Sequence, residues 1–156
     1  MKKLIFISLL LSFSSLSLLG QTNKLPVPTK AFIEKAKYFS DFEEKYFTKY
    51  IGKKTEKILK RFTDSKDICA SEYEFRTGIK MKSNSCSEAG SQVEIIFPNY
   101  SKNEVVKFVE WFFKNDFSEW NKAKTNYQPK EDGDAGCYLE IKELKGKIVL
   151  SYYCGC

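Results

Sequence analysis

The chain has 156 residues, with 26 Lys and Arg against 20 Asp and Glu, five cysteines and no histidine. This length fits one domain, and a hydrophobic fraction of 42% is enough for a packed core, which argues against wholesale disorder. The absence of histidine excludes a Ser-His-Asp triad, a Cys-His dyad, a His-ligated zinc ion and an imidazole pH switch.

The N-terminus has the residue order of a secretory signal peptide. Lys2 and Lys3 precede an uncharged run over residues 4–19, and Gly20 supplies a small residue before Gln21. The run is shorter than the roughly 20 apolar residues of a transmembrane helix. We therefore expect cleavage near Gly20, export to the periplasm or the medium, and no transmembrane span in the mature protein. A retained membrane anchor is the alternative. Gln21 stands where a lipoprotein signal needs cysteine, so no lipid anchor is expected.

This leader divides the chain into three parts. We expect a signal peptide over residues 1–20, an extended tether over 21–28 and a single domain over 29–156. Loss of the leader removes two lysines and lowers the net charge from +6 to +4. Arginine, which base reading favours, is rare among the basic residues, so we expect no nucleic acid partner.

Two helices are predicted at the start of the domain. Thr29 can cap a helix that runs to about Phe39, and Ser40 or Asp41 can cap a second one that runs to about Phe62. At 100° per residue the second helix has a lysine-rich face opposite its apolar face. We call it the basic face, and it consists of Lys49, Lys53, Lys57 and Lys60. A solvated surface is the simpler interpretation, and attachment to an anionic surface is the alternative.

The middle of the domain alternates with a period of two. Mostly apolar side chains occupy the odd positions from Tyr73 to Met81, which predicts one strand over residues 73–82 with one buried face. A loop rich in Ser, Asn and Gly is expected over 83–92, and a second strand over 93–97 continues the odd-numbered apolar face.

A capping box predicts the next helix. The Ser101 hydroxyl can accept a hydrogen bond from the Glu104 N–H, while the Glu104 carboxylate reaches back to the Ser101 N–H. We expect this helix to run to about Lys114 and to be followed by a long polar loop over 121–136.

The C-terminal residues predict a hairpin with strands over 137–144 and 147–154. A two-residue turn makes facing residue numbers sum to 291, which places Leu139 opposite Tyr152. The apolar side chains of both strands then share one face, which supports this register independently.

The same register suggests how the cysteines pair. Cys137 lies opposite Cys154 at the closer of the two backbone spacings in an antiparallel ladder, so we predict a disulfide between them. A second pair, Cys86 with Cys156, is expected because a loop and a chain end can adjust to each other, and Cys69 would then be free. Pairing of Cys137 with Cys156 is the competing arrangement.

The order of these elements predicts an α+β fold. N-terminal helices precede a ββαββ unit with a four-stranded, mainly antiparallel sheet, and we expect the capped helix and the N-terminal helices on opposite faces of that sheet. Four aromatic residues are the candidates for an exposed partner-contact patch, with a second core layer as the alternative. They are Trp111, Trp120, Tyr138 and Tyr153.

No residues stand out as catalytic, cofactor-binding or metal-binding. The sequence therefore favours a small exported, non-enzymatic domain that binds or inhibits a protein partner of unknown identity and oligomeric state. A small hydrolase that uses carboxylates, for example Glu140 with Glu94 or Glu104, is the rival hypothesis. Peripheral attachment through the basic face is a third.

Overall fold

A computed structural model describes residues 23–37, 41–87, 90–131 and 133–155. The described residues form a mixed α+β fold with these elements: α1 (Lys30–Ala36), α2 (Phe42–Tyr50), β1 (Lys53–Arg61), β2 (Ile68–Phe75), β3 (Lys80–Ser87), β4 (Gly90–Pro98), α3 (Lys102–Phe112), β5 (Ser118–Trp120), β6 (Asn126–Pro129), β7 (Gly136–Leu144) and β8 (Lys147–Gly155).

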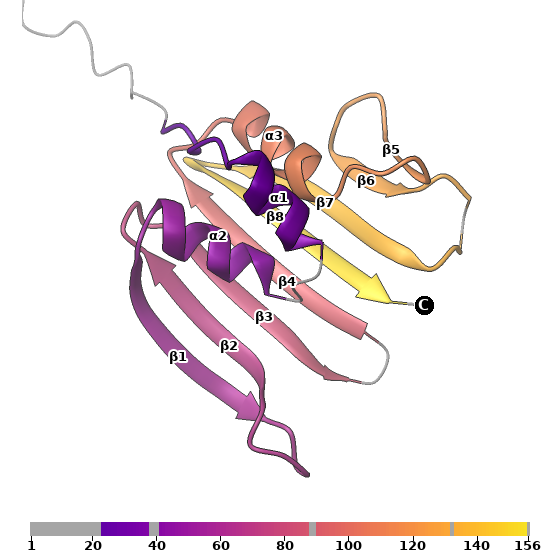
Figure 1. The fold of residues 1–156 in the computed structure, drawn as a ribbon. Coiled ribbons are helices and arrows are strands. Elements are labelled where there is room, and N and C mark those ends of the chain that lie inside the picture. Colours follow the sequence, from indigo (N-terminus) through magenta and orange to yellow (C-terminus); the bar gives the residue numbers. More distant parts are fainter. Residues whose placement is uncertain (1–22, 38–40, 88–89, 132, 156) are drawn as a thin grey trace, which may run out of the picture.

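The strands form one antiparallel sheet of eight strands in the order β1-β2-β3-β4-β8-β7-β6-β5 (Figure 1). The expected sheet of four strands was therefore wrong in size. Strands β1–β4 form one meander and β5–β8 another, and the two meet where β4 pairs with β8, from Gly90 opposite Gly155 to Pro98 opposite Lys147. Helix α3 connects the two meanders.

The second predicted helix was too long. Helix α2 ends at Tyr50, and Lys53–Arg61 forms the edge strand β1 instead. Gly52 separates the two elements with a φ of +98°, a left-handed conformation that ends a helix and that glycine adopts without strain. The side chains along β1 are exposed or half-buried, so burial imposes no alternation by which the sequence would reveal a strand.

The single strand expected over residues 73–82 is a hairpin. Strand β2 ends at Phe75, the chain turns at Gly78 with a φ of +80°, and β3 begins at Lys80. Tyr73 pairs with Met81, so odd-numbered residues stay on one face on both sides of the turn. The period of two therefore continued through the turn and concealed it.

Two of the expected loops also contain strands. Only residues 88–89 separate the ends of β3 and β4, although a loop over 83–92 was expected. The polar segment 121–136 contains β6, which pairs with β7 through Tyr127 opposite Leu139. Its apolar content is too small to reveal a strand by pattern alone.

Other local predictions are confirmed. The Thr29 hydroxyl accepts from the Phe32 N–H at the start of α1, and the Ser101 hydroxyl accepts from the Glu104 N–H at the start of α3. The other half of the capping box was wrong, because the Glu104 carboxylate accepts from the Leu25 N–H at 3.0 Å. The tether was expected over residues 21–28, of which 21 and 22 lie outside the described residues. Its described part contacts the rest of the protein through the buried Leu25, whose N–H donates to Glu104.

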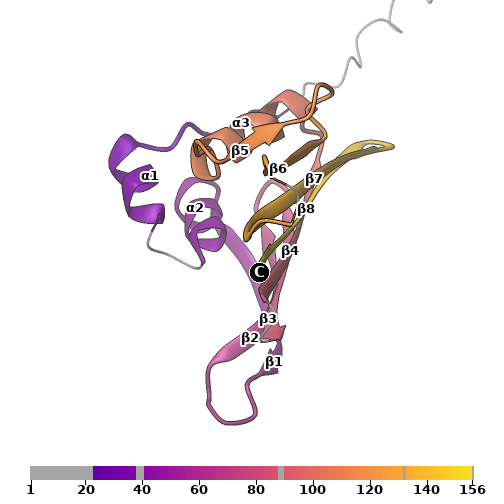
Figure 2. The ribbon, with the colours of Figure 1, turned by 90° about the vertical axis from the view of Figure 1, so that its right-hand side faces the viewer.

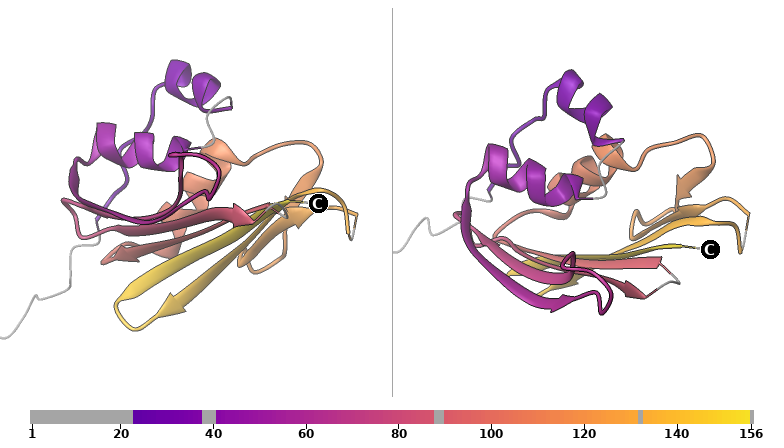
Figure 3. Two further views of the ribbon diagram at one scale, coloured as in Figure 1. Left: turned by 90° about the horizontal axis from the view of Figure 1, so that it is seen from below. Right: turned by 60° about the horizontal axis from the view of Figure 1, so that its bottom comes forward.

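All three helices of the described chain lie on one side of the curved sheet (Figures 2 and 3), so the expectation of helices on both faces was wrong. Phe47 of α2 stacks on Phe108 of α3 with ring centroids 5.3 Å apart, and both rings contact Phe97 of β4. These three rings are fully buried, and they join both helices and the sheet in one core.

Candidate ligand-binding cleft

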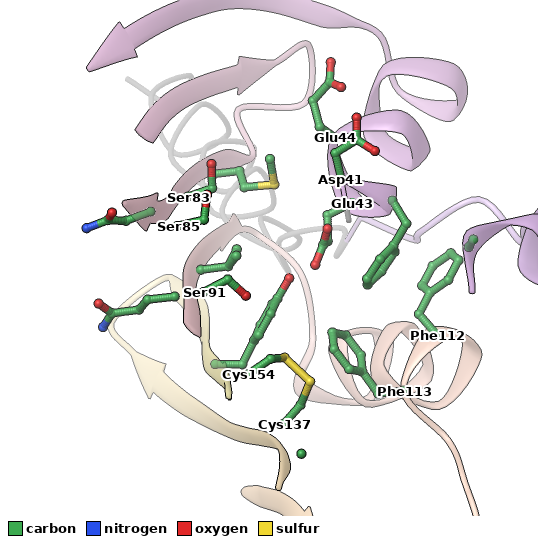
Figure 4. A pocket seen from close by; sticks show the side chains of 18 of the residues that line it. Asp41, Glu43, Glu44, Ser83, Ser85, Ser91, Phe112, Phe113, Cys137 and Cys154 are labelled. Atoms are coloured by element: carbon green, nitrogen blue, oxygen red, sulfur yellow. A yellow bond between two sulfur atoms is a disulfide. The ribbon is translucent and has the colours of Figure 1, made fainter. Parts of the chain in front are cut away.

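An open cleft of about 960 Å³ lies between the helices and the sheet face that they cover (Figure 4). One wall is aromatic and includes Phe42 at the start of α2 and Phe112 and Phe113 at the end of α3. The opposite wall is formed by β2, β3, β4 and the cysteine-bearing ends of β7 and β8.

The cleft exists because side chains on the helix-facing side of the sheet become smaller and more polar along each strand. On β2 the series is Phe75, Tyr73, Ser71, Cys69. On β3 and the residue before it, the series is Ile79, Met81, Ser83, Ser85. On β4 it is Phe97, Ile95, Val93, Ser91. The large members lie in the core, whereas the serines line the cleft. A serine fills far less space than a Phe or Ile further along the same strand, so the small side chains leave a hollow.

The hydroxyl groups of this wall are partly paired with one another. The Ser71 and Ser83 hydroxyls lie 2.9 Å apart across the β2–β3 pair, and the Ser85 hydroxyl donates to the Cys69 carbonyl at 3.3 Å. A hydroxyl group can both donate and accept, so these serines keep hydrogen-bonding capacity for a ligand.

Among the described residues that line the cleft, Glu43 is the buried carboxyl. It lies in the first turn of α2 with 3% of its surface exposed, and its side chain points into the cleft (Figure 4). Burial raises the pKa of this carboxyl to about 8, a hydrogen bond from its own backbone N–H opposes the rise, and the neighbouring Asp41 adds to it. The carboxyl is thus mostly protonated at neutral pH and can donate a hydrogen bond.

The two acidic neighbours of Glu43 have basic partners. Asp41 forms an ion pair with Lys45 at 2.5 Å, and Glu44 forms one with Lys53 at 2.7 Å. Among the described residues no lysine or arginine forms an ion pair with Glu43. Of these three carboxyls, Glu43 is therefore the one that stays mostly protonated at neutral pH.

Two disulfides border the cleft. Cys137 and Cys154 are bonded across β7 and β8, with Cα atoms 4.1 Å apart, in the register that the sequence indicated. The second expected pair was wrong: Cys86 is bonded to Cys69 across β2 and β3, with Cα atoms 4.8 Å apart. The hairpin at Gly78, which the sequence pattern concealed, is what brings these two cysteines together. Cys156 lies outside the described residues.

The four aromatic residues suggested as a contact patch do not come together. Trp111 and Trp120 pack against the core, and the ring centroids of Trp120 and Tyr127 are 5.1 Å apart. Tyr138 and Tyr153 pair across β7 and β8 on the other face of the sheet, because they alternate with the buried Leu139 and Tyr152. One surface cannot include all four.

The basic face is also divided. Lys49 lies on α2, whereas Lys53, Lys57 and Lys60 lie on the edge strand β1. The helix that was expected to carry these lysines does not exist beyond Tyr50, because the chain turns at Gly52.

The suggested carboxylates lie on different elements. Glu94 and Glu140 both pair with Ser151, on opposite sides of β8, so one strand separates them. Glu104 is on α3, where its carboxylate accepts from the Leu25 N–H and forms an ion pair with Lys107 at 2.7 Å. The structure does not bring Glu104 together with the other two.

Sequence reasoning missed Glu43 and the serine-lined wall. The alternation of β2 and β4 held a signal for the serines, since small polar residues replace large apolar ones on the buried face. Glu43 gave no such signal, because an acidic residue in the first turn of a helix is ordinary at the surface.

No family model, curated protein or solved structure matches this chain. In the described part of the chain no helix has both the length and the apolar character that a bilayer crossing requires. Nor do three or more Cys, Asp or Glu side chains of that part gather as a metal ion would need.

Proposed function

We propose that this protein is an exported, non-enzymatic binding domain and that the cleft is its binding site. The observation that carries the proposal is Glu43, a buried carboxyl that points into an open cavity with no basic partner among the described residues. A carboxyl that is buried without a basic partner lowers stability when it ionises, so such groups are unusual unless they serve a purpose. A volume of about 960 Å³ lies within the usual range for small-molecule sites.

The chemistry of the walls defines a class of ligand. Phe42, Phe112 and Phe113 offer apolar area, and the protonated Glu43 offers a hydrogen-bond donor. An uncharged ligand with an apolar body and a carbonyl or ether oxygen satisfies both. A carboxylate ligand is disfavoured, because Asp41 and Glu44 lie at the same site.

Export is part of the proposal. The two disulfides support it, because such bonds persist in oxidising compartments and are rare in the cytosol. The N-terminal signal peptide and its cleavage near Gly20 stay predictions, since those residues lie outside the described part of the chain.

An uncharged fluorescent dye that bears a carbonyl group, Nile red, tests the cleft. We expect saturable binding, with enhanced emission, that is lost when Ser91→Phe fills the cleft from β4. Ser151→Phe is the matched control, because Ser151 pairs with Glu94 on the face away from the helices. Equal dye binding by the two variants would show that the cleft is not the site.

A protein partner is the second candidate occupant. Phe117 borders the cleft and is 82% exposed, and such an apolar side chain at a rim suits contact with a protein segment. A captured partner that competes with Nile red for the wild-type protein would identify the cleft as its site. A partner that binds without displacing the dye would direct attention to Tyr138 and Tyr153 on the other face of the sheet.

A further inference from the structure

The β1–β2 hairpin carries exposed apolar side chains near its far end. We call residues 57–68 the hairpin tip, and this tip extends past the rest of the sheet (Figures 1 and 2). Eight large hydrophobic side chains of the described chain are exposed, and four of them lie in this short segment. The four are Ile58, Leu59, Phe62 and Ile68, each between 38% and 43% exposed.

The same segment carries basic side chains. The tip contains four basic residues against Asp64 and Asp67, which gives it a net charge of +2. The basic residues are Lys57, Lys60, Arg61 and Lys66. Within the described residues no ion pair involves any of them, and the Arg61 guanidinium donates to the Lys66 carbonyl instead. The tip thus presents apolar and positively charged groups together.

A second copy of the chain is the alternative partner for this surface, and pairing centred on Lys57 disfavours it. Strand β1 is an edge of the sheet, so its outer backbone groups could pair with another strand. Antiparallel pairing of two copies about Lys57 would set that lysine against itself and Lys53 against Arg61. Like charges directly opposite each other destabilise a pair of strands.

We propose that the hairpin tip docks onto an anionic lipid bilayer. Apolar side chains enter the boundary between headgroups and acyl chains, and lysines and arginines nearby are attracted to anionic headgroups. Ile68 belongs both to the tip and to the lining of the cleft, so docking would place the cleft beside the membrane. The docking proposal does not depend on what the cleft binds.

Co-sedimentation with lipid vesicles tests the proposal. Vesicles of phosphatidylcholine with phosphatidylglycerol are compared with vesicles of phosphatidylcholine alone. The protein is expressed from the full-length sequence and purified in the form that the cell produces. Two double variants alter the tip: Leu59→Ser with Phe62→Ser, and Lys57→Gln with Lys60→Gln. Lys145→Gln with Lys147→Gln is the matched control, because these exposed lysines lie at the β7–β8 turn and the charge change is the same.

We expect the wild-type protein and the control variant to bind the anionic vesicles but not the vesicles of phosphatidylcholine alone. Added salt should release the bound protein. Loss of two lysines from the tip should weaken binding at least about tenfold, since each basic residue near such a surface contributes on the order of a fivefold gain in affinity. Equal binding by all variants, equal binding to both kinds of vesicle, or equal weakening in the control would overturn the proposal. So would a dimer that the tip variants abolish in the absence of vesicles.

A reporter variant keeps the test independent of the folding of the double variants. Phe62→Trp adds one indole at an exposed position and leaves the core unchanged. Its emission should shift to shorter wavelength when anionic vesicles are added, because the ring leaves water. An unchanged spectrum with bound protein would show that the tip is not the point of contact.

Discussion

Two glutamates show how tertiary surroundings decide the behaviour of a side chain. Glu43 and Glu104 both lie in the first turn of a helix and both are buried. Burial also acts to raise the pKa of Glu104, but hydrogen bonds from Lys107 and from the Leu25 N–H outweigh it, and the pKa of Glu104 is lowered. No other residue of the described chain donates a hydrogen bond to the Glu43 carboxyl, and burial dominates. The two carboxyls therefore differ in charge at neutral pH.

Glu43 should make stability fall as the pH rises. The unfolded carboxyl titrates near 4.5 and the folded one near 8, so over this range the unfolded chain loses its proton first. Replacement by glutamine removes that cost, and Glu43→Gln should raise the free energy of unfolding by about 3 kcal/mol near pH 7, with no gain near pH 4. Urea denaturation at the two pH values measures the difference.

Glu44→Gln is the control for this prediction. Glu44 is the next residue of α2 and forms an ion pair with Lys53, so its replacement should give no gain that grows with pH. A Glu43→Gln variant whose stability parallels that of wild type at both pH values would show that the carboxyl is ionised in the folded protein.

At the scale of elements, glycines with positive φ decide where strands begin. Gly52 lies between α2 and β1, and Gly78 lies between β2 and β3. Hydrophobic periodicity does not detect either position. At Gly52 the lysine spacing fits a helix as well as an exposed strand, and at Gly78 the period of two is the same before and after the turn. Capping residues were more informative at Thr29 and Ser101, which bond to specific N–H groups nearby. Asp41, predicted with Ser40 as the alternative cap of α2, precedes that helix without a side-chain cap bond, and Ser40 lies outside the described residues.

Gly52→Ala should destabilise the protein. The residue has a φ of +98°, and an added Cβ would lie 3.0 Å from Nε of Arg76. The left-handed conformation alone costs about 1–2 kcal/mol for alanine, and displacement of Arg76 adds to this. Gly133→Ala is the control, because Gly133 has a φ of +86° but its added Cβ would meet open space. Chemical denaturation should show a larger loss for Gly52→Ala, and an equal loss would contradict the role of Arg76.

At the scale of the whole molecule, the helices cover only part of a large sheet. Phe47, Phe97 and Phe108 fill the space where the layers touch, whereas the serines at the other end of the strands leave the cleft. The two disulfides hold β2 to β3 and β7 to β8 around that cleft. These bonds link the ends of the strands that lie outside the apolar core.

Removal of either disulfide should therefore lower stability. Each bond joins cysteines 17 residues apart, for which loop-closure entropy predicts a loss of about 3 kcal/mol. Cys69→Ala with Cys86→Ala and Cys137→Ala with Cys154→Ala should each lower the melting temperature. A reducing agent should lower the melting temperature of the wild-type protein. It should not change the melting temperature of a variant in which all four of these cysteines are replaced by alanine. A wild type insensitive to reduction would show that the bonds do not stabilise the fold.

The amino-acid sequence by itself determined the features that depend on near neighbours. The caps at Thr29 and Ser101, the start of α3 and the register of the C-terminal hairpin all depend on residues close together in the chain or on a tight turn. The sequence also determined the mixed α+β class, because helical and strand periods both occur in it.

Only the tertiary structure decided the size of the sheet, the side on which the helices pack and the place of the cleft. The pairing of β4 with β8 joins strands that are far apart in sequence, and no local pattern specifies it. The partner of Cys86 and the protonation of Glu43 depend on such distant contacts as well. The physical reason is that burial, which raises the pKa of Glu43 and leaves the serines around a hollow, is a property of the assembled layers and not of any single segment.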